Sequence, residues 1–212
     1  MDRATVRVHE QERADDDTLM AATATGDDRA FAALIDRHGA RVAGLAQRML
    51  GPSGDVDEVV QEAFLRLWTR APAWQPGGAK VSTWLYRVAS NLCIDRLRKP
   101  RTANLDDAVE PVDPSATPDR VHDAEVAGRR IDAALRELAP RQRLAIVLCH
   151  YQGLSNIEAA ENLGVSVDAL ESLLARGRRA LKKALEGDQD WLIAALAEGG
   201  MTESDDKTQE RG

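Results

Sequence analysis

Apolar residues recur every three or four positions over several stretches of the chain, and this period places side chains on one face of an α-helix. Between Asp27 and Gly51 the apolar positions are Phe31, Leu34, Ile35, Val42, Leu45, Met49 and Leu50. Gly51 and Pro52 predict the end of this core helix. His38 has no carboxylate or second histidine at helical spacing, so we interpret it as a surface or half-buried residue rather than a ligand.

A second helix is predicted from about Asp55 to Arg70, because acidic residues open it and favour the positive end of the helix dipole. Its core face would carry Val56, Val59, Val60, Ala63 and Leu67. The other face mixes acids, an amide and large apolar groups, namely Glu58, Gln61, Glu62, Leu65 and Trp68. Such a mixture suits a surface that docks another helix. The alternative is that Phe64 and Trp68 simply complete the core.

A third helix, Val81 to Lys99, follows a loop with two prolines and two glycines that carries Trp74. Its apolar residues are Leu85, Val88, Ala89, Leu92, Ile94 and Leu97. From Lys80 to Arg101 there are six basic residues and one acid, Asp95, although the whole chain has a formal net charge of -7. A basic helix headed by aromatic residues predicts contact with nucleic acid. The alternative is a solvated basic face with two aromatic side chains in the core.

The composition changes after Pro100. Residues 102–125 hold seven acids, one base and three prolines, which predicts a flexible acidic linker. Beyond the linker, Ile131, Leu135 and Leu138 indicate one helix. Leu144, Ile146, Val147 and Leu148 indicate another.

The next segment has the pattern of a helix-turn-helix. Ser155 and Glu158 form a capping box, and Ala160, Gly164 and Leu170 have the spacing of two closely crossing helices joined by a left-handed turn. Ser166 would cap the last helix, whose N-terminal half, Val167 to Ser172, would face base edges in the major groove. Its basic residues are Arg176, Arg178, Arg179, Lys182 and Lys183. A helical hairpin with a charged outer face is the alternative.

Composition narrows the class of protein. The 212 residues are 43% hydrophobic and only 4% aromatic, which favours an all-α fold of two small helical domains. No apolar run approaches the roughly 20 residues that cross a bilayer, and no signal pattern opens the chain, so we expect a cytoplasmic protein without membrane contact. Cys93 and Cys149 have no CxxC spacing and are interpreted as buried free thiols. No phosphate loop, metal-ligand spacing or activated nucleophile is found, so we expect no enzyme, cofactor or metal.

Three motifs together resemble the extracytoplasmic function (ECF) sigma factors of the sigma-70 family: DEVVQEAFLRLW, STWLYRVASNLCIDRLRK and LAPRQRLAIVLCHYQGLSNIEAAENLGVS. The resemblance extends from about Asp17 to Leu185. It implies sigma region 2 and sigma region 4 as the two helical domains. The implied divisions are an N-terminal arm at 1–16, region 2 at 17–101, the acidic linker at 102–125, region 4 at 126–186 and a C-terminal extension at 187–212.

The resemblance also implies a function in transcription initiation, with core RNA polymerase, promoter DNA and an anti-sigma factor as partners, and a role in stress responses. Docking on the beta-prime clamp helices of the polymerase would involve Glu58, Gln61, Glu62, Phe64 and Trp68. Recognition and melting of the minus-ten element would involve Lys80, Ser82, Trp84, Arg87, Asn91 and Arg98. Binding of the minus-thirty-five element would involve Val167, Asp168, Glu171, Ser172, Arg176, Arg178, Arg179 and Lys182.

The sequence departs from the family pattern at two places. Leu170, Glu171, Ser172 and Leu173 stand where many relatives carry a lysine and an arginine, so the minus-thirty-five sequence cannot be carried over. The extension holds a short apolar patch around Trp191, which is either a helix packed on the second domain or a docking site for a regulator. A helix-turn-helix regulator that binds duplex DNA without joining the polymerase is the competing function, but it would leave the surfaces before residue 100 unused.

Overall fold

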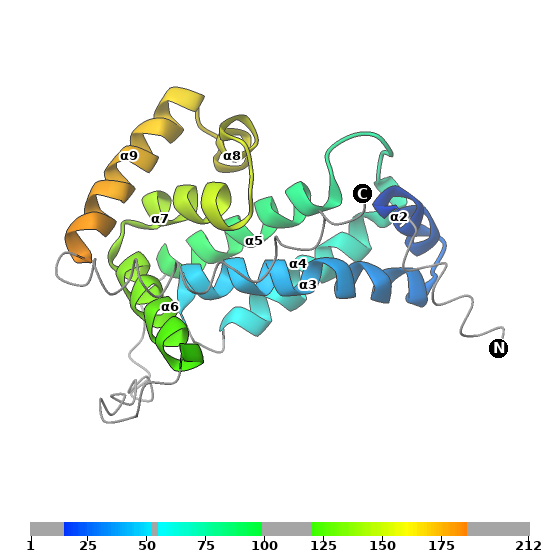
Figure 1. The fold of residues 1–212 in the computed structure, drawn as a ribbon. Helices are drawn as coiled ribbons and strands as arrows, with labels where there is room; N and C mark the ends of the chain where they lie inside the picture. The colour runs from blue at the N-terminus through cyan, green and yellow to red at the C-terminus, as the bar shows by residue number, and fades with distance from the viewer. Residues whose placement is uncertain (1–14, 52–54, 99–119, 186–212) are drawn as a thin grey trace, which may run out of the picture.

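The computed structural model describes residues 15–51, 55–98 and 120–185, and for residues 120–127 it describes the backbone alone. These parts of the chain form helices and no strands, which confirms the all-α prediction (Figure 1). The predicted arm and extension fall almost wholly outside the described residues, as does most of the predicted linker. Helix α6 begins at Arg120, before the predicted end of the linker at residue 125.

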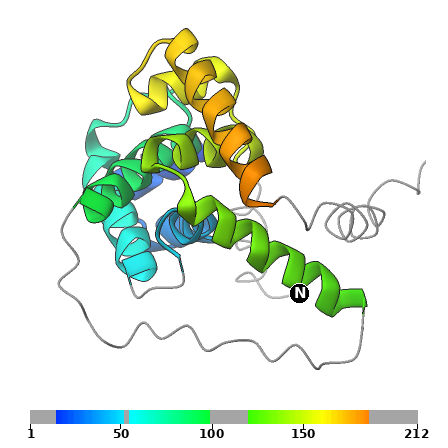
Figure 2. The same ribbon diagram turned by 90° about the vertical axis from the view of Figure 1, so that its left-hand side faces the viewer.

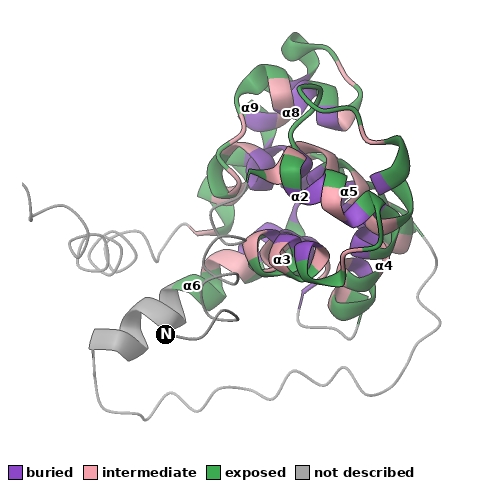
Figure 3. Cartoon of the chain, turned by 90° about the vertical axis from the view of Figure 1, so that its right-hand side faces the viewer, coloured by how far each residue is buried: buried purple, intermediate pink, exposed green. Residues whose placement is uncertain are grey.

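The first group of helices is built around α3 (Asp28–Leu50), which packs against α2 (Asp16–Ala24), α4 (Asp55–Arg70) and α5 (Val81–Arg98). The Asp27 side chain accepts hydrogen bonds from the backbone N–H groups of Arg29 and Ala30 and so begins α3, while Gly51, at φ 84°, ends it. Buried positions line the inward sides of these helices (Figure 3). The short 3-10 helix η1 (Ala71–Ala73) continues α4 into the loop that precedes α5.

His38 is more deeply buried than the sequence predicted. Its side chain is buried, with 5% exposure, and its Nε2 lies 3.0 Å from Oδ2 of Asp16 on α2. Arg37 donates to the other carboxylate oxygen of Asp16 at 2.6 Å. The interpretation of His38 as a surface or half-buried residue was wrong because its partner comes from another helix, which spacing within one helix cannot reveal.

The second group contains α6 (Arg120–Glu137), α7 (Pro140–Ile146), the π-helical turn η2 (Val147–Tyr151), α8 (Asn156–Leu163) and α9 (Val167–Ala184). Both bonds of the predicted Ser155–Glu158 capping box are present, and Gly164 ends α8 in the left-handed conformation, at φ 64°. Leu170 is fully buried. These observations confirm the predicted helix-turn-helix. A Cβ on Gly177 would come within 2.7 Å of Ile146 Cδ1, so glycine at this position lets α9 pack closely on α7.

The two groups share one apolar core rather than standing apart on a tether. Helices α7 and α8 pack on α5, and α6, α7 and η2 pack on α3 (Figure 2). Arg143 of α7 is buried, and its guanidinium donates to the carbonyl oxygens of Met49, Arg136 and Leu138. Beside it, the Arg48 guanidinium lies 4.1 Å from the centre of the Tyr151 ring. Polar and cation–π contacts therefore join residues that are about a hundred positions apart.

Cys93 is buried as expected, but Cys149 is only half-buried, so the expectation of two buried thiols holds for Cys93 alone. The difference predicts different reactivity. Burial raises the pKa of the Cys93 thiol to about 12, whereas Cys149 is half-buried and its pKa is raised by partial burial. Because the thiolate is the nucleophile, iodoacetamide at mildly alkaline pH should modify Cys149 and leave Cys93 intact in the folded protein. Peptide mass spectrometry checks this. Both thiols should react after unfolding in guanidinium, and equal native rates would contradict the placement of Cys93.

Candidate nucleic-acid and protein interfaces

The first candidate surface lies on α4. One face of this helix carries Glu58, Gln61, Glu62 and Leu65. An open hollow of about 600 Å³ is lined by these four residues and by Leu92 and Arg96 of α5. Leu65 is 59% exposed and is the most exposed large apolar residue on this helix among the described residues. Arg96 Nη2 lies 3.3 Å from Glu58 Oε2 at the rim. This face therefore offers an apolar centre surrounded by carboxylates and an amide.

Two of the predicted docking residues are less exposed than the rest: Phe64 turns into the core, and Trp68 lies half-buried at the edge of this face. Phe64 is only 4% exposed and its ring meets Phe31 of α3 edge-on, with the centroids 6.3 Å apart. The Trp68 ring is half-buried and contacts the same Phe31 ring at 4.9 Å. Phe64 thus completes the core, which was the alternative interpretation. Leu65 lies on the exposed face, as the helical spacing of positions 58, 61, 62 and 65 predicted, although the set implied by the family resemblance named Phe64 instead.

The second candidate surface is a stripe along α5. Lys80, just before the helix, is followed by Trp84, Arg87, Asn91 and Arg98 at intervals that keep all five on one face. Trp84 is half-buried and the other four are exposed. Ser82, which was predicted with them, falls on the other side of the helix because it is two residues from both Lys80 and Trp84. The stripe combines positive charge with an aromatic ring and an amide.

The loop before α5 adds an aromatic hollow to this stripe. The rings of Trp74 and Trp84 meet nearly at right angles, 85°, with their centroids 6.4 Å apart. Together with Arg70, Gln75, Gly78 and Ala79 they line an open hollow of about 150 Å³. Aromatic faces beside a guanidinium are suited to stacking on unpaired bases. Arg70 and Gln75 were absent from the predicted set, since only the folded loop brings them to the Trp84 ring.

Asp17 of α2 holds this loop in place. It was also absent from the residues predicted to recognise the minus-ten element. Its Oδ1 accepts a hydrogen bond from Nε1 of Trp74 at 2.9 Å, and its Oδ2 accepts one from the backbone N–H of Gly77 at 2.9 Å. These bonds, that of Trp74 foremost, lower the pKa of the Asp17 carboxyl below its usual value. No signal in the sequence links residues so far apart.

The third candidate surface is the outer side of α9. All eight residues predicted to meet the minus-thirty-five element are exposed: Val167, Asp168, Glu171, Ser172, Arg176, Arg178, Arg179 and Lys182. Asp168, Ser172, Arg179 and Lys182 follow one outward stripe, opposite the buried Leu170 and Leu174. Arg178 lies beside that stripe, where its Nη2 is 3.5 Å from Nε2 of His150. The helix is thus acidic near its start and basic toward its end.

Among the described residues, no group of three or more histidine, cysteine, aspartate or glutamate side chains could hold a metal ion. None of the described helices is both long and apolar enough to cross a membrane.

Comparison with known proteins agrees with this geometry. The model of Sigma-70 region 2 matches residues 34–102, and that of Sigma-70 region 4 matches residues 128–181. The chain is 33% identical over 171 residues to the ECF RNA polymerase sigma factor SigE of Mycolicibacterium smegmatis, covering 76% of this chain and 65% of that protein. It is 32% identical over 175 residues to the ECF RNA polymerase sigma factor SigK of Mycolicibacterium vanbaalenii, covering 80% and 88%.

Solved structures show the same fold. CnrH in complex with the cytosolic domain of CnrY matches with a TM-score of 0.61 and 31% identity, covering 82% of this chain and 98% of CnrH. The sigma factor RpoE in complex with the anti-sigma factor NepR from Bartonella quintana matches with a TM-score of 0.56 and 21% identity, covering 74% and 98%. The fold, the helix-turn-helix and the two regional matches define a sigma factor of the sigma-70 type. The chain belongs to the ECF RNA polymerase sigma factors.

Proposed function

We propose that this sigma factor binds core RNA polymerase and directs it to promoters with two separate elements. The observation that carries the proposal is the basic stripe of α5 beside the Trp74–Trp84 hollow. A regulator that binds closed duplex DNA through α9 has no use for a hollow that suits unpaired bases. Promoter melting needs such a site, because a base that leaves the duplex must be held.

Each of the three surfaces has a separate role in this proposal. The face of α4 around Leu65 docks on the clamp helices of the polymerase beta-prime subunit, with Glu58, Gln61 and Glu62 fixing the register. The stripe from Lys80 to Arg98 follows the opened minus-ten strand. The exposed side of α9 enters the major groove at the minus-thirty-five element. The catalysis of transcription belongs to the polymerase, and the sigma factor supplies promoter choice in the cytoplasm.

An anti-sigma protein is proposed as the controlling partner. The CnrH and RpoE structures were each determined as a complex, with CnrY and with the anti-sigma factor NepR respectively. CnrH shares 31% of its sequence with this chain over most of its length, so an inhibitor of comparable kind is expected to cover the DNA-facing and polymerase-facing surfaces here.

Comparing DNA binding by the protein alone with DNA binding in the presence of core polymerase tests the proposal. The protein alone should bind a promoter duplex weakly, and with core polymerase it should form a promoter-specific complex. Electrophoretic mobility shifts with and without the polymerase measure this difference. Tight, sequence-specific binding of the protein alone, unchanged by polymerase, would instead indicate the helix-turn-helix regulator.

Phosphate contact by α9 gives a separate prediction. Replacing the exposed Arg179 by alanine should weaken holoenzyme binding to a minus-thirty-five duplex and reduce the slope of log K against log salt by about 0.9, the contribution of one phosphate contact. A salt titration by fluorescence anisotropy measures the slope. Arg29→Ala, in the exposed first turn of α3, is the matched control and should leave the slope unchanged. An unaltered slope for Arg179→Ala would remove this residue from the interface.

A further inference from the structure

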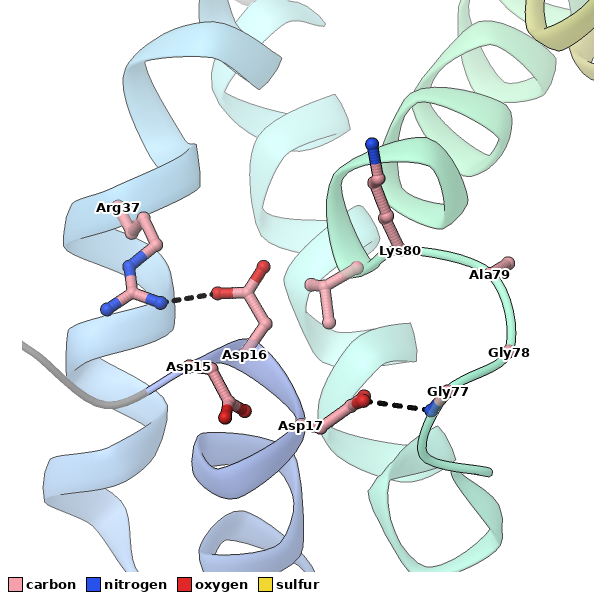
Figure 4. A pocket seen from close by; sticks show the side chains of 9 residues that line it. Asp15, Asp16, Asp17, Arg37, Gly77, Gly78, Ala79 and Lys80 are labelled. Atoms are coloured by element: carbon pink, nitrogen blue, oxygen red, sulfur yellow. Dashed lines mark hydrogen bonds and ion pairs between the residues drawn. The ribbon is translucent and has the colours of Figure 1, made fainter.

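Asp17 lies in the first turn of α2, yet both oxygens of its carboxylate bind the distant loop before α5. Oδ1 accepts from the Trp74 indole N–H and Oδ2 from the Gly77 backbone N–H, each at 2.9 Å. Figure 4 shows the carboxylate directed at Gly77, while the neighbouring Asp16 is directed at Arg37. Asp15 is used locally as the N-cap of α2. Of these three adjacent acids, Asp17 is the one that binds both Trp74 and Gly77 of the loop.

The two bonds fix different parts of the loop. The bond to Trp74 sets the rotation of the indole ring that forms one wall of the aromatic hollow. The bond to Gly77 holds the backbone at a residue with φ 75°, in the left-handed region that glycine adopts readily. Bonds to an ionised acceptor are shorter and stronger than neutral ones. One side chain therefore orients a ring and restrains the turn that leads to Lys80.

The charge of Asp17 argues against a role in holding phosphate. A carboxylate beside a surface that meets DNA repels the backbone and lowers non-specific affinity. A helix-dipole role needs a negative charge near the start of α2, and Asp15 and Asp16 already supply it. The contribution of Asp17 to DNA recognition therefore has to pass through the loop it holds.

We propose that Asp17 is a positioning residue for base recognition: it holds the Trp74 ring and the Gly77 backbone so that the hollow between Trp74 and Trp84 accepts one unpaired base of the minus-ten strand. This inference rests on the proposed function in promoter melting. Phosphate contacts position a strand, whereas the fit of a base in its pocket gives sequence preference. Asp17 thus affects which sequence is opened, and Lys80 and Arg87 affect how tightly any strand is held.

The test uses the full-length protein with core polymerase and a library of bubble templates whose minus-ten element is randomised and already unpaired. Bound templates are sequenced, and the base preference is measured at each position. Asp17→Asn keeps the size of the side chain, but its NH₂ group cannot accept a hydrogen bond. The variant should reduce the preference at one position on the order of tenfold, since a bond to a charged group is lost. Preferences at the other positions and at the minus-thirty-five element should stay as in the wild type.

A second measurement separates positioning from a general loss of structure. Because Asp17→Asn removes a negative charge, its affinity for duplex DNA of random sequence should stay equal or rise, whereas a misfolded protein would lose affinity and preference together. Trp74→Phe keeps an aromatic ring without the N–H donor and should reduce preference at the same position. The loss in the double variant should be smaller than the sum of the two single losses, because both variants disturb the Asp17–Trp74 bond. Asp28→Asn, an exposed acid in the first turn of α3, is the charge-matched control.

The outcomes are distinct. An unchanged preference profile for Asp17→Asn, or a loss spread evenly over every position, overturns the role of Asp17. A wild-type complex with no base preference in the randomised element overturns the proposed function itself. A loss confined to one position and shared with Trp74→Phe supports the inference.

Discussion

Replacing Arg143 by leucine is expected to lower the free energy of unfolding by about 3 kcal/mol, since three carbonyl groups lose their donor and each buried unsatisfied group costs roughly 1–3 kcal/mol. The acceptors are the carbonyl oxygens of Met49, Arg136 and Leu138. Met49 stands in the last turn of α3, where carbonyls have no partner within the helix. The guanidinium therefore caps α3 from a helix of the other group and joins region 4 to region 2.

Urea unfolding followed by circular dichroism measures this effect. Arg143→Lys should recover only part of the stability, because an ammonium group is a point charge that cannot reach three carbonyls in different directions. Arg141→Leu is the matched control: Arg141 is exposed on the same helix and should tolerate the change. If Arg143→Leu and Arg141→Leu unfold at the same urea concentration, the buried arginine does not hold the two groups together.

Replacing Leu65 by glutamate is expected to weaken binding to core polymerase by about 2–4 kcal/mol, or roughly 30- to 1000-fold in Kd. The leucine is 59% exposed in the free protein and stands at the centre of the α4 surface. An interface that covers it would have to bury an unpaired carboxylate among the carboxylates of Glu58 and Glu62. The stability of the free protein should change little, because the side chain is largely in water before docking.

Surface-immobilised core polymerase and biolayer interferometry measure this affinity. Ile157→Glu is the matched control, since Ile157 is 63% exposed on α8, outside the proposed docking surface. The control should bind polymerase like the wild type. Equal binding of Leu65→Glu and Ile157→Glu would show that polymerase docks on another face.

The residues that sequence alone placed correctly are those governed by local rules. The capping box at Ser155, the left-handed Gly164 and the buried Leu170 follow from the needs of two helices that cross closely. The basic stripe of α5 was likewise visible, because its members repeat with the period of one helix face. Local backbone chemistry and periodicity suffice for such features.

What the sequence did not reveal depends on contacts between distant segments. Periodicity placed Leu65 on the exposed face of α4, but the family resemblance named Phe64 in the docking set, and only the packing of α4 on α3 shows that the Phe64 ring is buried against Phe31. The pairing of His38 with Asp16 joins α3 to α2, and that of Trp74 with Asp17 joins the loop before α5 to α2. In the sequence, Arg143 is one more basic residue of a predicted helix. Its role as a cap for the carbonyl groups at the end of α3 is visible only in the folded structure.

Run-off transcription tests the central claim most directly. Sheared genomic DNA from the source organism is transcribed by core polymerase with and without this protein, and the transcript starts are sequenced. The account predicts new starts that share a two-part upstream element, and their loss with Leu65→Glu. No new starts, from folded protein that binds promoter duplex specifically by itself, would contradict it.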